Sequence, residues 1–219
     1  MIDWSLLWTG TYETLLMTLF ASLFSYLIGL PLGVLLVITR KGGIKPMPMF
    51  NTILGAVINF MRSIPFILLI AMLIPVTRAV MGTAIGTAAS VFPLVVSASP
   101  YVARMVEQSL LEVDNGVVEA SQSMGSTTMQ IIFKVLLPEA LPSLLNGAAV
   151  SITTILAYTA MVSAVGGGGI GAYAITKGYQ RGKKFYKFMY AASAILVLLV
   201  QAITFIGTRL SRRLDHRIR

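Results

Sequence analysis

The sequence contains no cysteine, and its one histidine, His216, lies close to the C-terminus. Disulfides, thiolate metal sites and cysteine nucleophiles are therefore impossible. A buried catalytic triad or a histidine metal cluster would also lack its imidazole. These absences argue against an enzyme that uses the common side-chain machinery, and they predict no metal site and no cofactor in this chain.

Charge is scarce as well. Only 11% of the 219 residues are charged, whereas 56% are hydrophobic and the mean hydropathy is +0.83. Soluble domains carry roughly 25% charged residues, so this chain lacks the polar side chains to cover a surface in water. Its net charge of +9 comes from basic residues confined to a few short stretches, a pattern typical of a protein beside anionic lipid. We therefore predict an integral membrane protein that contacts lipid and binds no nucleic acid.

Long runs without Asp, Glu, Lys or Arg indicate where the chain crosses the bilayer, because an ionised side chain at its centre costs on the order of 3 kcal/mol or more. Four such runs exceed the roughly 20 residues that a span requires: residues 14–39, 79–103, 140–176 and 188–208. A fifth apolar stretch, 46–77, contains only Arg62. The sequence thus predicts an all-α protein with five transmembrane helices, near 14–38, 50–76, 84–102, 144–165 and 188–207.

The basic residues also predict the orientation. With the N-terminus outside, the cytoplasmic segments hold ten Lys and Arg, five of them in the tail from Arg209 to Arg219, and the outer segments hold six. The positive-inside rule favours this N-out, C-in arrangement. Most of the outer cations gather before the last span, where they could contact lipid head groups or an acidic binding protein; they are Lys177, Arg181, Lys183, Lys184 and Lys187.

We expect a single membrane domain over residues 1–219, because no repeat or long linker divides the chain. Its largest polar interruption, at about 107–142, is predicted to lie in the cytoplasm and holds five of the eight acidic residues. Gly125 predicts the left-handed end of one short helix, and Thr127 with Gln130 forms a capping box that begins a second. Pro138 is expected to end the second helix, because it has no N–H for the next backbone hydrogen bond. A solvated loop that merely connects two spans is the alternative reading.

The same loop carries a spaced motif, made of Glu119, Ala120, Ser121, Gly125 and the segment Val135-Leu136-Leu137-Pro138. It resembles the signature loop of importer-type ABC permeases, in which Glu-Ala-Ala is followed by Gly and then by Ile-x-Leu-Pro. Ser121 and Val135 depart mildly from that pattern. The resemblance implies that the first short helix is a coupling helix seated in a cleft of an ATPase subunit. Glu119 would then pair with the ATPase, Ala120 would permit close approach and Gly125 would form the turn, while Ser121 and Pro138 complete the motif.

Along nearly the whole chain the sequence is similar to the permease subunits of methionine importers, for example at Tyr12-Glu13-Thr14-Leu15 and Arg62-Ser63-Ile64-Pro65-Phe66. This resemblance implies the type I ABC importer fold in a bacterial cytoplasmic (inner) membrane. It further implies a homodimer with two ATPase subunits and an external substrate-binding protein or lipoprotein, importing methionine by alternating access. The chain has no phosphate-binding loop, because Gly182-Lys183 is followed by Lys184 and lacks the preceding Gly. ATP and Mg²⁺ are therefore expected on the partner ATPase.

Three residues within the predicted spans are candidates for the translocation pathway. Arg62 could face the carboxylate of an amino acid, or it could pair with carbonyls freed by a kink at Pro65. Tyr158 and Met161 lie one helical turn apart and match positions of the methionine-permease pattern. An amphipathic ring and a soft thioether suit a narrow gate for a methionine side chain, with plain helix packing as the alternative. Gly166, Gly168 and Gly171 have dinucleotide-fingerprint spacing, but without a preceding strand we interpret them as a flexible turn.

Alternative functions make different predictions. A permease for another amino acid or an organic sulfur solute would share the motif and differ in the solute that stimulates the ATPase. A self-sufficient secondary carrier or channel would transport without an ATPase and would tolerate Glu119→Lys. A membrane scaffold would show no flux in either case.

Overall fold

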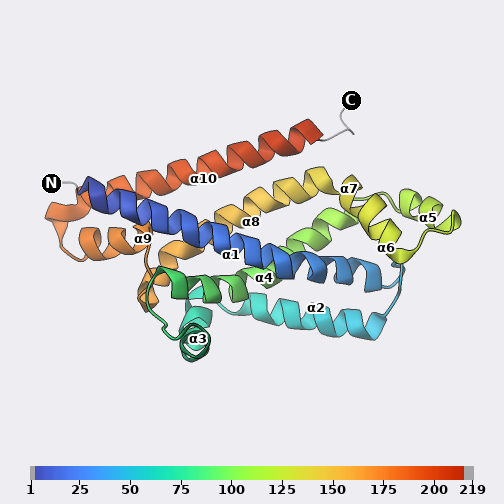
Figure 1. Ribbon diagram of the computed structural model, residues 1–219, viewed down its shortest axis with the longest axis horizontal. Helices are drawn as coiled ribbons and strands as arrows, with labels where there is room; N and C mark the ends of the chain where they lie inside the picture. Colours follow the sequence, from blue (N-terminus) through green and yellow to red (C-terminus); the bar gives the residue numbers. More distant parts are fainter. Residues whose placement is uncertain (1–2, 215–219) are drawn as a thin grey trace. The chain divides into compact units, whose positions relative to one another are not determined.

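The computed structural model describes residues 3–214, and every regular element in that part of the chain is a helix (Figure 1). The α-helices are α1 (Trp4–Thr39), α2 (Pro48–Ser63), α3 (Phe66–Met81), α4 (Thr87–Leu111), α5 (Asn115–Ser123), α6 (Thr128–Ile131), α7 (Leu137–Glu139), α8 (Leu141–Met161), α9 (Ile170–Tyr173) and α10 (Tyr186–Leu214). Short 3₁₀ or π segments join some of them: η1 (Ile132–Leu136), η2 (Val162–Val165), η3 (Ala174–Tyr179) and η4 (Lys183–Phe185). His216, Arg217 and Arg219 lie outside the described residues.

Within residues 3–214, four helical segments are long and apolar enough to cross a membrane. These segments are α1, α4, α8 together with η2, and α10. Helices α2 and α3 have only 16 residues each, and they make a fifth span if the interrupted pair is counted as one. The predicted all-α membrane protein is confirmed, with four or five candidate spans.

The predicted continuous helix at 50–76 is wrong, because the chain breaks between α2 and α3. Pro65 has φ −54° and ψ 131°, an extended conformation that belongs to neither helix. It cannot donate a helical hydrogen bond, and its ring restricts the preceding residue to extended conformations. The helix restarts when the N–H groups of Leu68 and Leu69 bond to the Pro65 carbonyl. The sequence prediction missed this break because it relied on the continuous apolar composition of the stretch.

The four long spans are all longer than the sequence predicted, and α1 and α10 show the reason. Helix α1 begins at Trp4 instead of near residue 14, with the Asp3 carboxylate accepting a hydrogen bond from the Leu6 N–H at 3.2 Å. Helix α10 extends beyond 188–207 at both ends. The prediction used charged residues as helix boundaries, whereas these helices continue through Glu13 and Arg209.

The chain forms two compact units, and several long helices contribute to both. Unit 1 contains the chain up to Ser25, Ile64–Ala98 and Ile152–Thr204. One of its two apolar cores joins α1, α3, α4, α8 and η2, with Met17, Leu94 and Ile155 fully buried. The other joins the N-terminal turns of α1 to α9, η3 and the start of α10.

Unit 2 contains Tyr26–Ser63, Ser99–Ser151 and the chain from Phe205 on. Its main core packs the C-terminal half of α1 and α4 against α6 and η1. The Arg104 side chain strengthens this unit, because it pairs with Glu107 at 2.6 Å and donates to the Gly55 carbonyl of α2 at 3.0 Å. The motif-bearing loop is therefore built onto a well-packed base.

Candidate functional site

Helix α5 carries the first half of the motif on an exposed surface. The Asp114 carboxylate caps the helix by accepting a hydrogen bond from the Gly116 N–H at 2.6 Å. Glu119 and Ala120 are exposed, whereas Ser121 is 6% exposed. Ser121 thus faces the interior of unit 2. The free surface of α5 presents one carboxylate beside a small side chain.

Gly125 makes the corner between α5 and α6. Its φ of 78° lies in the left-handed region, and a Cβ placed there would meet no atom within 4 Å. The corner is closed by hydrogen bonds from the Gly125 N–H to the Gln122 carbonyl at 2.9 Å and from the Ser126 N–H to the Ser121 carbonyl at 3.1 Å. Glycine is required here for its backbone conformation and not for space. The predicted left-handed stop is confirmed.

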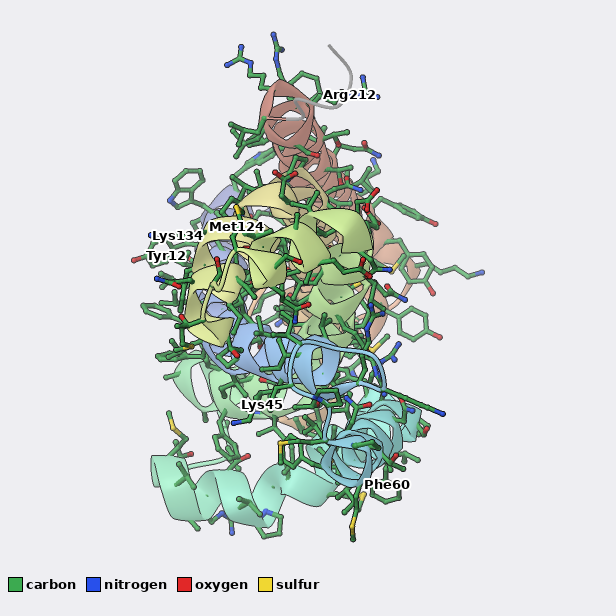
Figure 2. The ribbon with its side chains drawn as sticks, turned by 90° about the vertical axis from the view of Figure 1, so that its right-hand side faces the viewer. Tyr12, Lys45, Phe60, Met124, Lys134 and Arg212 are labelled. Atoms are coloured by element: carbon green, nitrogen blue, oxygen red, sulfur yellow. The ribbon has the colours of Figure 1, made fainter. Side chains whose placement is uncertain are left out.

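The predicted capping box begins α6. The Gln130 N–H donates to Thr127 Oγ1 at 3.4 Å, and Gln130 Oε1 accepts from the Thr127 N–H at 2.8 Å. Met124 and Lys134, labelled in Figure 2, help to line a pocket of about 370 Å³ beside the corner. Met124 is 79% exposed, so an apolar side chain stands at the tip of the corner.

Pro138 does not end the second helix, contrary to the prediction. The π-helical segment η1 precedes it, and the Leu137 N–H bonds to the Ile132 carbonyl, five residues back. Helix α7 contains Pro138, and the Ala140 N–H resumes ordinary spacing by bonding to the Leu136 carbonyl at 3.0 Å. The wider π turn changes the hydrogen-bond register where proline has no N–H to offer. Pro138 itself is exposed.

A cleft of about 350 Å³ separates α5 from the chain that follows α1. Apolar side chains form part of its wall, including Val37, Leu110 and Val118, and Glu119 also lines it. Arg40 Nη2 crosses to donate to Asn115 Oδ1 at 3.3 Å. The position of α5 is thus linked to the end of α1 within unit 2.

Two of the pathway candidates lie in unit 1. The Tyr158 ring stacks on Phe66, with centroids 4.1 Å apart and planes 12° from parallel. Phe66 is the first residue of α3, directly after the break at Pro65, and the sequence interpretation did not assign it a role. Met161, at the end of α8, is 47% exposed. The structure therefore pairs Tyr158 with an aromatic partner at the start of α3 and leaves the thioether accessible.

Arg62 belongs to unit 2 and lies in the last turn of α2. Its side chain is exposed, and it makes no hydrogen bond to any residue that the structure describes. It does not bond to the carbonyls near Pro65, which was one of its two predicted roles. A cation at this position is stabilised by the negative end of the helix dipole.

Glu13 accepts two hydrogen bonds that the sequence interpretation missed. Glu13 Oε2 accepts a hydrogen bond from the Gly169 N–H at 2.8 Å, and Oε1 accepts from the Tyr173 hydroxyl at 3.3 Å. Thr14 Oγ1 accepts from the Ile170 N–H at 2.9 Å. Burial raises the pKa of the Tyr173 phenol above its ordinary value, and the adjacent Glu13 raises it further, so the phenol stays a donor. Figure 1 shows α9 beside the N-terminal part of α1.

The glycine-rich segment after η2 is tightly packed and is not the loose turn that we predicted. A Cβ at Gly167 would collide with Val162, and one at Gly168 would collide with Thr87. At Gly169, which also has a φ of 97°, a Cβ would lie 2.7 Å from Met17 Cε. The glycines allow the backbone to approach α1 closely enough for Glu13 and Thr14 to accept its N–H groups.

Comparison with known proteins identifies the family of this chain. Residues 29–219 match the family described as "Binding-protein-dependent transport system inner membrane component". The chain belongs to this family. Family membership confirms the predicted multi-pass protein of a transport system in the inner membrane.

Individual members of the family are similar over long stretches. A probable D-methionine transport system permease protein MetI of Vibrio cholerae is 48% identical over 212 residues, which cover 97% of this chain and 93% of the relative. The D-methionine transport system permease protein MetI of Escherichia coli K12 is 50% identical over 156 residues, which cover 71% and 72% of the two chains. The predicted resemblance to methionine permeases is thus confirmed.

Solved structures of ABC transporters are also similar to this chain. A structure of the MetNI methionine ABC transporter in an inward-facing conformation superposes with a TM-score of 0.93 and 45% identity, covering 96% of this chain and 97% of the other. A more distant amino acid ABC transporter, 22% identical, has a TM-score of 0.77 and supports the fold alone. The type I ABC importer permease fold is confirmed.

Proposed function

We propose that this chain is the permease subunit of an ATP-driven methionine importer and forms its translocation pathway. Family membership makes it a component of a binding-protein-dependent transport system. Methionine is supported by the 48% identity to a D-methionine permease over 97% of the chain. The working assembly is a homodimer with two ATPase subunits and an external binding protein, oriented N-out and C-in.

The observation that carries the coupling mechanism is the exposed, capped helix α5. Glu119 and Ala120 are free for a partner, while Ser121 is buried beneath them and the α6–η1 segment is rooted in the core of unit 2. A force applied at α5 is therefore resisted by packed side chains and passes into α1 and α4. Closure of the ATPase dimer by ATP and Mg²⁺ would move α5 and switch the permease between its inward-facing and outward-facing states, since packed interfaces convert local shifts into discrete rearrangements.

The pathway residues have separate roles in this proposal. Tyr158, backed by Phe66, and the accessible Met161 form a gate that accepts a thioether side chain. Sulfur against an aromatic ring is a favourable contact. Arg62 attracts the carboxylate of the substrate, because its guanidinium has no partner among the described residues.

Methionine uptake by proteoliposomes tests the proposal, with the chain co-purified with its ATPase and supplied with the binding protein. We expect methionine to stimulate ATP hydrolysis. We also expect Glu119→Lys to reduce uptake by about tenfold or more, because the new lysine would repel the positive group of the ATPase that Glu119 is proposed to pair with. Glu112→Lys makes the same change at an exposed acid outside α5 and should leave uptake near the wild-type rate.

The other outcomes identify the alternatives. Stimulation by another amino acid or an organic sulfur compound, with none by methionine, would contradict the substrate assignment and leave the permease function intact. Flux without the ATPase, unaffected by Glu119→Lys, would indicate a secondary carrier or channel. No flux in any arm would indicate a scaffold.

A further inference from the structure

Helix α10 differs from the other spans in how little of it is covered. Only 6% of its most apolar 18-residue stretch is buried, compared with 50% of the corresponding stretch of α1 and 56% of that of α4. Large apolar side chains on its unit 1 part are open, with Val197 58% and Leu198 68% exposed. In a membrane protein such a surface faces hydrocarbon, so the start of α10 marks where this part of the chain meets the membrane interface.

A basic and aromatic cluster lies at that start. We call it the collar and define it by Lys177, Tyr179, Arg181, Lys183, Lys187 and Tyr190. The collar begins within η3, includes part of η4 and continues into the first turns of α10. Tyr179 is 60% and Tyr190 is 65% exposed. Tyrosine, lysine and arginine together are typical of the boundary between hydrocarbon and head groups, where the rings and aliphatic stems lie in the apolar layer and the polar tips in water.

The collar is held in a defined shape. The Tyr179 ring stacks on Tyr186 at 6.1 Å, and the Arg181 guanidinium lies over the Phe185 ring at 5.7 Å. Gly178 allows η3 to approach α10 closely, because a Cβ there would lie only 2.8 Å from Met189 Cβ. These contacts keep Arg181 at the base of α10.

The collar has no acidic neighbour along its own stretch of the chain. The sequence contains no Asp or Glu between residues 140 and 214. Within the described part of the chain, none of the four collar cations forms a salt bridge. Each Lys or Arg near an anionic membrane surface attracts it with an appreciable free energy, and a short cluster adds these contributions.

We propose that the collar is a binding site for the head group of an anionic phospholipid, with the acyl chains along the exposed face of α10. Arg181 and Lys183 contact the phosphate, and Tyr179 and Tyr190 bracket the glycerol region. An acidic protein surface would match the charge equally well. The lipid is favoured because the collar continues directly into an uncovered apolar helix and carries two exposed tyrosines, features that suit an amphiphile.

The experiment compares lipid retention by the full transporter in nanodiscs made from equal parts of phosphatidylcholine and phosphatidylglycerol. Native mass spectrometry counts the lipids that remain bound after release. We expect phosphatidylglycerol to be retained in preference to phosphatidylcholine. Arg181→Gln with Lys183→Gln should weaken its apparent affinity by roughly 25-fold, about fivefold for each charge removed.

Two controls make the result specific. Arg78→Gln with Lys134→Gln removes the same charge from two exposed cations outside the collar and should retain the lipid. Arg181→Lys with Lys183→Arg keeps the charge and should also retain it, which excludes a folding defect as the cause.

Three results would overturn the proposal. The first is unchanged phosphatidylglycerol retention in the double glutamine variant. The second is an equal loss in the variant that lacks the charges of Arg78 and Lys134, which would indicate net charge alone. In the third, the double glutamine variant retains phosphatidylglycerol, but in pure phosphatidylcholine the binding protein stimulates its ATP hydrolysis less than that of the wild type. That result would make the collar a protein-docking surface.

Discussion

Replacing Glu13 by alanine should open the glycine-rich segment that follows α8 and η2. The substitution removes the acceptor for the Gly169 N–H, which is bonded at 2.8 Å on a buried residue, and for the more distant Tyr173 hydroxyl at 3.3 Å. A buried donor left without a partner costs about 1–3 kcal/mol. We take about 3 kcal/mol for the pair, because the bond from Tyr173 is long. At 1.4 kcal/mol for each factor of ten, local opening becomes roughly a hundredfold more frequent.

Hydrogen exchange measures that opening directly. In nanodiscs, the Gly169 amide should exchange about a hundredfold faster in Glu13→Ala, while Glu13→Gln keeps one acceptor oxygen and should show an effect of roughly fivefold. The adjacent Ile170 amide is an internal comparison, because its acceptor is Thr14 Oγ1 and remains in place. Thr14→Val should reverse the order, with Ile170 affected more than Gly169.

An unchanged exchange rate at Gly169 in Glu13→Ala would refute this reasoning. It would mean that the packing of Gly167 to Gly169 against Val162, Thr87 and Met17 holds the segment without the carboxylate. A general acceleration across unit 1 would also count against it, since the predicted effect is local.

Two further predictions concern unit 2. Gly125→Ala should destabilise the α5–α6 corner by about 1–2 kcal/mol, because a left-handed conformation is strained for any residue with a Cβ even though space is free; hydrogen exchange of the Ser126 amide should rise about tenfold, and an unchanged rate would contradict the strain. Arg104→Met should cost about 3 kcal/mol, because it leaves the Glu107 carboxylate, 18% exposed, without its partner. The double variant with Glu107→Leu should recover part of that loss in thermal unfolding, and strictly additive losses would show that the two side chains do not interact.

The sequence predicted the motif loop well because its structure is determined locally. A left-handed residue and a capping box each depend on side chains within three or four positions of one another, and both were found at Gly125 and Thr127. The existence of apolar spans was predictable for a similar reason, since hydropathy depends only on composition along one helix. The buried position of Ser121 followed from neither rule, because it depends on the direction in which α5 lies on the core of unit 2.

Pro65 and Pro138 show why local rules also failed. Both lack an N–H, yet the chain breaks at Pro65 and continues helically through Pro138. The difference lies in the preceding turn. The π segment before Pro138 moves the hydrogen bond of Leu137 back to Ile132, whereas Pro65 adopts an extended conformation and begins a new helix. A proline rule that ignores the preceding turn cannot distinguish these cases.

Glu13 explains the largest error in the span boundaries. We expected α1 to begin after it, because an unpaired carboxylate is costly inside an apolar helix. The structure satisfies that carboxylate with an N–H and a hydroxyl from residues more than 150 positions away, at Gly169 and Tyr173. The cost that defined the boundary is therefore offset by a contact that no local pattern contains. A charged residue marks the end of a span only where the fold provides no partner for it, and here the glycine-rich segment provides one.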